Sequence, residues 1–414
     1  MIAPTHPSAS LLERFCRYVQ IDTQSNPNSQ TVPTTAKQKD LGRLLVQELQ
    51  ALGAIDAELD DKGYVYATIP ASPGCEAEPV IMLCAHMDTS PDASGTGVRP
   101  LVHPNYQGQD LPLPDDPSIV VSPGTDPALL AQLGHTLITA SGTTLLGADN
   151  KAGVAEIMTV AERLLRGVPG LRHGKVRILF TPDEEVGRGA DHVDLQKLGA
   201  DFGYTLDGEE RGTLEDETWN ADGATVVFDG VSAHPGFAKG RLVNAVKAAA
   251  GFVASLPADQ SPEATEGRQG FVHPVSATGT AERAEVKLIL RDFTLEGLAA
   301  QHQLLQRLAR QAAEALGAQM HYHPAEQYRN MKQVLDQHPQ VVERALAAMR
   351  RCGLQPERRS IRGGTDGARF TLMGLPCPNL FAGEHAFHSK KEWVSLEDME
   401  LAVQVALEVL RVPA

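Results

Sequence analysis

The stretch VRILFTPDEEVG, residues 176–187, joins an apolar run to two adjacent glutamates, Glu184 and Glu185. An apolar run that ends in a turn sequence such as Thr-Pro-Asp is typical of a strand buried on both faces, as in a parallel sheet. Two neighbouring carboxylates repel each other, so burial at the end of such a strand raises a pKa or demands a cation. The alternative is a solvent-exposed turn without a catalytic or metal-binding role. The other motifs of the chain are needed to distinguish the two interpretations.

Similar apolar runs alternate with helical patterns from residue 8 to residue 204. Strands are predicted at YVYATIP (64–70), VIMLCAH (80–86) and FGYTLDG (202–208), and helices at residues 11–21 and 34–53. Strands that alternate with helices predict an α/β fold with a mostly parallel sheet covered on both faces. The segment 90–127 is rich in Pro, Gly and Asp, and connections of that length are usually functional or disordered.

The pattern changes from about residue 213. Strands are predicted at 223–231, 271–280, 284–293 and 318–324, and helices at 244–256 and 295–317. The order β-α-β-β-α-β is the ferredoxin-like pattern. We therefore expect an inserted ferredoxin-like α+β domain at residues 213–325, within a catalytic domain formed by 1–212 and 326–414. One continuous mixed domain is the alternative.

Length, charge and cysteine content restrict the class of protein. A chain of 414 residues exceeds the size of a single core, so two domains are expected. A net charge of −15 argues against nucleic acid and anionic membrane surfaces as partners. No apolar run approaches the roughly 18 to 20 residues that span a bilayer, and residues 1–15 do not resemble a signal peptide. The five cysteines form no CxxC pair, which suits a cytoplasmic protein.

Oxygen and nitrogen ligands follow the predicted strands, where open α/β sheets place their sites. His86 and Asp88 lie in LCAHMDTS, and a carboxylate two residues from a histidine can orient a metal-bound imidazole. Asp149 ends a Gly-rich turn, where a simple helix N-cap is the alternative. Asp207 follows a further strand, and His385 and His388 lie in GEHAFHSKKEW. Each signal is weak alone, but together they are hard ligands suited to hydrolytic Zn²⁺, Mn²⁺ or Co²⁺.

The charges of these ligands favour two ions rather than one. Two divalent ions bring a charge of +4, which three carboxylates and a bridging hydroxide neutralise. If one carboxylate is shared, each ion has four ligands: a histidine, a carboxylate of its own, the shared carboxylate and the hydroxide. One glutamate of the pair is then left as a general base for the metal-bound water.

The motifs HMDT, GADNKAG, TPDEEVG, LDGEE and FHSKKEW, in this order, resemble the M20 family of di-zinc peptidases over nearly the whole chain. The resemblance implies that His86, Asp149 and Asp207 hold one metal, that Asp149, Glu185 and His388 hold the other, and that Asp149 bridges. It further implies that Asp88 orients His86, that Glu184 is the general base, and that His388 rather than His385 is the ligand. Family members often have a second Asp where this chain has Asn150, a difference from which we expect little consequence.

Substrate handling is also predicted from the resemblance. The inserted domain usually dimerises in this family, so we expect a homodimer that acts on a small peptide, and His234 in SAHPG is the candidate to stabilise the oxyanion. Arg291 and the loop RGGTDG, with Arg362, Gly364 and Asp366, could bind the peptide carboxylate or backbone. Plain turns are the alternative for His234 and for the loop.

The function predicted is a metal-dependent aminopeptidase that removes the N-terminal residue of tripeptides, with zinc as the expected metal and cobalt or manganese as alternatives. The insertion after Asp88 and the RGGTDGA loop favour this branch of the family. Another hydrolase of the family, a dipeptidase, carboxypeptidase or N-acyl amino acid deacylase, is the first alternative. A non-catalytic metal-binding relative is the second, and the presence of Glu184 argues against it.

Overall fold

A computed structural model describes residues 10–412 of the chain, which forms two compact units. Unit 1 contains Met1–Asp216, Gln333–Ser360 and Thr365–Ala414, and unit 2 contains Glu217–Lys332 and Ile361–Gly364. The segment 1–9, which the sequence predicts not to be part of a signal peptide, lies outside the described residues. Within residues 10–412, none of the helices has both the length and the apolar character needed to cross a bilayer.

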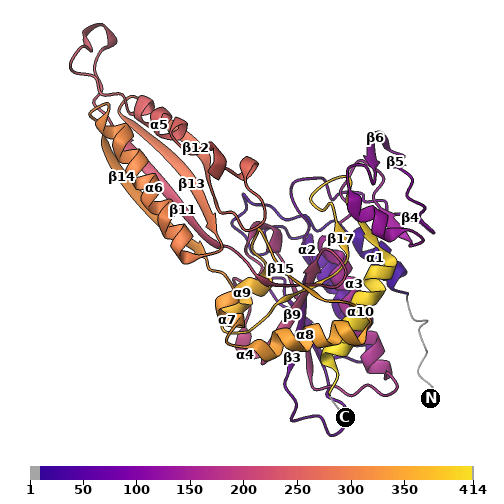
Figure 1. Ribbon diagram of the computed structural model, residues 1–414. Helices are drawn as coiled ribbons and strands as arrows, with labels where there is room; N and C mark the ends of the chain where they lie inside the picture. The colour runs from indigo at the N-terminus through magenta and orange to yellow at the C-terminus, as the bar shows by residue number, and fades with distance from the viewer. Residues whose placement is uncertain (1–9, 413–414) are drawn as a thin grey trace. The chain divides into compact units, whose positions relative to one another are not determined.

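Unit 1 is built on an eight-stranded sheet in the order β1-β2-β8-β3-β9-β16-β10-β15 (Figure 1). The strands are β1 (Ile55–Leu59), β2 (Val65–Ile69), β8 (Val176–Thr181), β3 (Ile81–His86), β9 (Phe202–Gly208), β16 (Asn379–Phe381), β10 (Thr213–Glu217) and β15 (Glu357–Ser360). The four central strands β8, β3, β9 and β16 are parallel, whereas β2 pairs with β8 in the antiparallel direction. The α/β prediction is confirmed, with an antiparallel hairpin at one edge.

Helices cover both faces of this sheet. They are α1 (Leu11–Val19), α2 (Gln38–Leu52), α3 (Ala148–Arg166), α4 (Leu195–Leu198), α7 (Lys332–Leu335), α8 (Pro339–Arg351), α9 (Asp366–Leu372) and α10 (Leu396–Leu410). Met82 and Cys84 of β3 pack in one cluster with Phe370 of α9, while α3 packs against β3 and β9. Alternate residues of β3 must face opposite sides, so a strand covered on both faces is apolar throughout.

The long segment that follows β3 is structured and carries further small sheets. Strands β17 (Glu384–His385), β18 (Trp393–Ser395), β7 (Leu137–Thr139) and β4 (Leu101–His103) form one, and β5 (Leu111–Leu113) pairs with β6 (Asp116–Val121). A satellite core that includes Tyr106, Leu113 and Trp393 lies beneath them. The C-terminal segment of unit 1 is thereby held next to the long insertion.

Unit 2 is a four-stranded antiparallel sheet in the order β12-β13-β11-β14, with two helices that pack on it and on each other. Its elements are β11 (Asn220–Asp229), α5 (Ala245–Ala254), β12 (Phe271–Gly279), β13 (Arg283–Asp292), α6 (Leu295–Glu314) and β14 (Gln319–Tyr328). This is the ferredoxin-like element order that the sequence predicts. Phe228 of β11 and Phe252 of α5 lie in its core, with ring centroids 5.9 Å apart.

Candidate functional site

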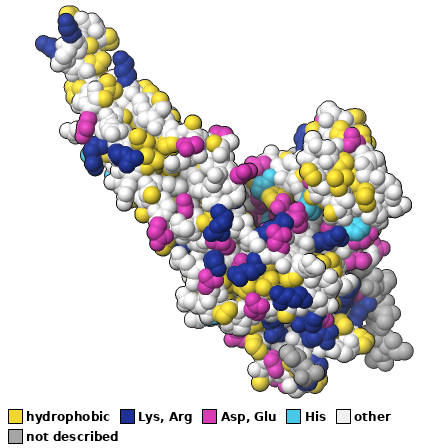
Figure 2. Space-filling view, viewed as in Figure 1, with side chains coloured by type: hydrophobic (Ala, Val, Ile, Leu, Met, Phe, Trp, Pro, Cys, Tyr) yellow, Lys and Arg dark blue, Asp and Glu magenta, His cyan; other side chains and the backbone are white. Residues whose placement is uncertain are grey.

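The parallel strands of unit 1 bring their carboxyl ends to one edge of the sheet. His86 is the last residue of β3, Asp207 lies at the end of β9, and the glutamate pair begins the short 3₁₀ helix η2 (Glu184–Val186) after β8. Because β3 lies between β8 and β9 and runs parallel to both, these side chains come from one edge. On the face seen in Figure 2, acidic and histidine side chains gather beside the β5–β6 segment.

Two groups of potential metal ligands meet at Asp149, and both consist of residues that the sequence predicts as ligands. In the first, His86 Nε2 lies 2.9 Å from Asp149 Oδ1 and 3.3 Å from Asp207 Oδ1. In the second, His388 Nε2 lies 3.2 Å from Asp149 Oδ2 and 2.8 Å from Glu185 Oε2. One ligand atom from each member of a group lies within 4.8 Å of the others. The two oxygens of Asp149 therefore face two different groups.

The electrostatics of the two groups suit cations. Burial and the carboxylate of Asp207 raise the pKa of Glu184 well above its ordinary value, and His86 opposes that shift. Burial and Asp149 likewise raise the pKa of Glu185 to about 8. Hydrogen bonds to Asp149 and Glu185 raise the pKa of His388 to about 11. Carboxylates crowded in this way are stabilised by a positive charge between them.

An unsatisfied atom supports the fit of a metal ion to these residues. The Oε1 atom of Glu185 is buried and has no hydrogen-bond partner among the described residues, and its side chain is 3% exposed. A buried carboxylate oxygen without a partner is costly, and a bound cation would satisfy it. The donor set of imidazole and carboxylate, without thiolate, is one that divalent zinc, cobalt or manganese accepts.

The carboxylate of Asp88 connects β3 to the glutamate pair. It is fully buried and accepts hydrogen bonds from the backbone N–H groups of Glu184 (3.0 Å) and Glu185 (3.2 Å). Its Oδ1 also lies 3.4 Å from Nδ1 of His86, and its backbone oxygen lies 3.0 Å from the same nitrogen. Asp88 thus positions both glutamates as well as the histidine, and the glutamate contacts were not predicted from the sequence.

Two further buried carboxylates hold the loops of the site, and neither is predicted from the sequence. Glu392 accepts hydrogen bonds from the backbone N–H groups of Leu146 (2.7 Å), Gly147 (2.8 Å) and Asp149 (3.0 Å). Asp183 accepts hydrogen bonds from the backbone N–H of Thr34 (2.8 Å) and from Gln38 Nε2 (2.7 Å). Because these partners are more than a hundred residues away in the chain, local sequence carries no signal for them.

The remaining predicted residues of unit 1 lie in defined environments. Asp366 is buried, accepts a hydrogen bond from Thr181 Oγ1 (2.6 Å), and burial raises its pKa to about 7. His385 stacks on Trp393 with ring centroids 4.0 Å apart and belongs to neither ligand group. The side chain of Asn150 accepts a hydrogen bond from the N–H of Gly153 (3.1 Å) at the start of α3.

The other predicted substrate residues belong to unit 2. His234 is exposed, and its Nδ1 accepts a hydrogen bond from the N–H of Gly236 (3.1 Å). The guanidinium of Arg291 lies 5.5 Å from the ring of Tyr328, and Gly364 packs near the same ring. Arg362 stacks over Trp219 at 4.8 Å and donates to the carbonyl oxygen of Gly267 (2.8 Å).

Comparison with known proteins identifies the family. Residues 145–412 match the model of peptidase family M20/M25/M40. The chain belongs to this family. It is 44% identical over 402 residues to proteins named peptidase T from Bacillus cereus (strain Q1) and Geobacillus kaustophilus, which covers 97% of this chain and 97% of each relative. The chain is therefore an enzyme, a peptidase T-like hydrolase, and the prediction from the motifs is confirmed.

Solved structures of M20 peptidases and their neighbours share the fold. Aminopeptidase PepT from Bacillus cereus superposes with a TM-score of 0.73 at 22% identity, covering 97% of each chain. A dinuclear metal-binding peptidase of family M20 from Bacillus subtilis superposes with a TM-score of 0.64 at 17% identity, covering 97% of this chain and 96% of that one. At these identities the similarity establishes the α/β fold of the M20 family for this chain and no more.

Proposed function

We propose that the protein is a metal-dependent aminopeptidase that removes the N-terminal residue from tripeptides. The observation that carries this proposal is the position of Asp149, whose two carboxylate oxygens face two separate His-carboxylate groups. The names of its relatives agree, since the 44% identical proteins are called peptidase T and a structural neighbour from Staphylococcus aureus is called a tripeptidase.

The proposed ligands are His86, Asp149 and Asp207 for one ion and Asp149, Glu185 and His388 for the other, with zinc as the metal. Two such ions would lower the pKa of a water molecule at the site and would polarise the scissile carbonyl. The side chain of Glu184 is 16% exposed and its Oε2 lies 4.0 Å from His86 Nε2, so it borders the site without being needed in either group. We assign to Glu184 the role of accepting the water proton and passing it to the leaving amine.

The roles of the other predicted residues complete this proposal. Asp88 orients His86 and the glutamate pair, and the buried Asp366 supports the strand end through Thr181. His234 stays a prediction for the oxyanion. The predictions for the peptide carboxylate or backbone also stay, and their residues are Arg291, Arg362, Gly364 and Asp366. Loss of kcat with full metal content in a His234→Ala protein would support the first role, and unchanged turnover would exclude it. A homodimer in the cytoplasm is also proposed, and light scattering of the purified protein tests the dimer.

The experiment that tests this function compares three substrates with the zinc-loaded protein. They are a free tripeptide, the same peptide with an acetylated N-terminus, and an N-acetyl amino acid. We expect cleavage of the free tripeptide alone, with release of its first residue. Cleavage of the N-acetyl amino acid would assign the protein to the deacylases of the family instead, and the absence of any turnover with metal bound would indicate a non-catalytic relative.

A further inference from the structure

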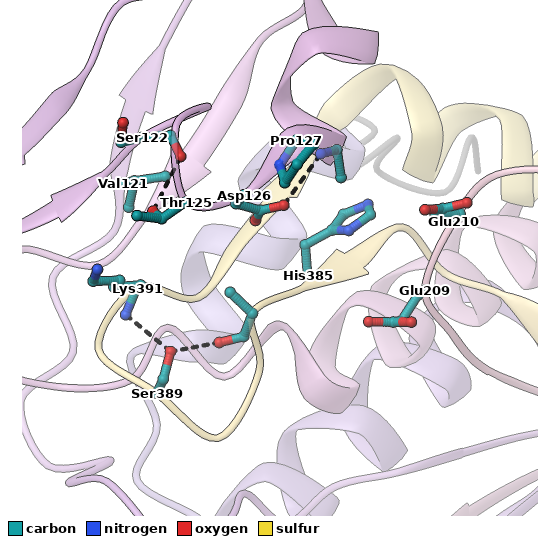
Figure 3. A pocket seen from close by; sticks show the side chains of 12 residues that line it. Val121, Ser122, Thr125, Asp126, Pro127, Glu209, Glu210, His385, Ser389 and Lys391 are labelled. Atoms are coloured by element: carbon teal, nitrogen blue, oxygen red, sulfur yellow. Dashed lines mark hydrogen bonds between the residues drawn. The ribbon is translucent and has the colours of Figure 1, made fainter. Parts of the chain in front are cut away.

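Unit 1 contains a cavity of about 520 Å³ (Figure 3). It is formed by the insertion after β3, the end of β9 and the segment around β17. Two of its lining residues neighbour proposed ligands in sequence, since Ser389 follows His388 and Glu209 lies two residues after Asp207. Its lining residues are Val121, Ser122, Thr125, Asp126, Pro127, Ala128, Glu209, Glu210, His385, Ala386, Ser389 and Lys391.

Three carboxylates and one ammonium line this cavity, and one of the carboxylates is unpaired. Asp126 accepts hydrogen bonds from Trp393 Nε1 (2.7 Å) and from the N–H of Ala128 (3.2 Å). Glu210 forms an ion pair with Arg359, with an N–O distance of 2.8 Å. The side chain of Glu209 is exposed and has no hydrogen bond or ion pair within residues 10–412. Glu209 is therefore free to bind a cation that enters the cavity.

A histidine in the wall is also unsatisfied. His385 is 4% exposed, and its buried Nε2 has no hydrogen-bond partner in the part of the chain that the structure describes. Burial lowers the pKa of His385, so this imidazole does not add a positive charge to the wall. Figure 3 shows its ring between Asp126 and Glu210, on the side of the cavity that carries the negative charges.

We propose that this cavity binds the basic side chain, lysine or arginine, of the N-terminal residue of the peptide substrate. The inference rests on the proposed aminopeptidase function, because the first residue of the peptide must lie next to the scissile carbonyl at the ligand groups. The carboxylate of Glu209 pairs with the cationic end of that side chain.

The size and the lining of the cavity favour a side chain over the α-ammonium group alone. An ammonium group is about as large as one water molecule, for which a cavity of about 10 to 15 Å³ suffices, far less than the 520 Å³ of this cavity. A lysine or arginine also has an apolar stem that prefers apolar contacts below its charged end. Val121, Pro127 and Ala128 supply such contacts in the wall.

The test compares Lys-Gly-Gly with norleucine-Gly-Gly, because norleucine has the same stem as lysine but no ammonium. For the zinc-loaded wild-type protein we expect kcat/KM to be at least about tenfold higher for the lysine peptide, the range of one charge-assisted hydrogen bond. Glu209→Gln should reduce this preference to within about threefold, mainly by lowering kcat/KM for the lysine peptide. Glu400→Gln, an exposed glutamate on α10 outside the cavity lining, is the matched control and should keep the preference.

Two results would overturn the proposal. An equal fall in kcat/KM for both peptides in Glu209→Gln would mean that Glu209 binds the α-ammonium, and no preference for lysine in the wild type would mean that the cavity binds no basic side chain. If neither peptide is cleaved, the aminopeptidase function fails first. Calorimetry with free L-lysine and L-norleucine then tests the cavity by itself. Tighter binding of lysine that Glu209→Gln abolishes would support the proposal, and equal binding of the two amino acids would overturn it.

Discussion

Replacement of Asp88 by asparagine tests the positioning of the glutamate pair. The Asp88 carboxylate accepts one backbone N–H on each oxygen, at 3.0 Å and 3.2 Å. An asparagine keeps one acceptor and turns the other into an NH₂ group, so one backbone N–H faces a donor at hydrogen-bond distance. A buried donor left unpaired costs about 1 to 3 kcal/mol, which corresponds to a loss of about 5- to 150-fold in an equilibrium constant or rate.

We expect this loss in zinc affinity, in kcat/KM, or divided between the two. The turn that the substitution disturbs carries both the proposed ligand Glu185 and the proposed base Glu184. The assay is chelator competition for zinc affinity, together with kcat/KM for a tripeptide. Asp40→Asn is the matched control, since the side chain of Asp40 is 62% exposed and lies on α2. A folded Asp88→Asn protein that stays within twofold of the wild type in both measurements would refute the role of Asp88.

Two further predictions concern the ligand groups. Zinc binding should release protons, because metal ligands bind in their deprotonated forms. Without metal, burial raises the pKa of Glu185 to about 8. Hydrogen bonds to Asp149 and Glu185 raise the pKa of His388 to about 11. Apparent zinc affinity should therefore increase from pH 6 to pH 8, and calorimetry in buffers of different ionisation enthalpy should detect at least one proton per protein; release of none would contradict this. Glu392→Gln should lower zinc affinity about 10- to 100-fold, because only one of its oxygens remains to hold the loop of Asp149, and an unchanged affinity in chelator competition would exclude that role.

The sequence predicts the parts of the fold that depend on local pattern. The apolar runs that become β3, β8 and β9 are recognisable because strands covered on both faces carry no polar alternation. The element order of unit 2 is readable because each strand and helix there has its own period. The direction of β2 cannot be predicted from the sequence, because an apolar run such as Val65–Ile69 looks the same in a parallel and an antiparallel pair.

The candidate site likewise contains residues that local sequence predicts and residues that it does not. Residues at the carboxyl end of a strand, such as His86 and Asp207, are found from sequence because parallel strands end at one edge. Glu392 lies in SKKEW, where it looks like one more charged loop residue, and its three backbone partners lie more than 240 residues away in the chain. The cavity around Glu209 is equally invisible, because its walls come from three separate segments.

The adjacent glutamates have different tasks in the proposed site, and the most direct measurement of this difference compares Glu184→Gln with Glu185→Gln. Zinc content and tripeptide turnover are measured on both proteins after dialysis against limiting zinc. We predict that Glu184→Gln retains two zinc ions and loses about 10²- to 10⁴-fold in kcat, the contribution of a general base. Glu185→Gln should retain one zinc ion or fewer. These assignments are contradicted if Glu184→Gln loses its zinc while Glu185→Gln keeps both ions, or if Glu184→Gln turns over the peptide at the wild-type rate.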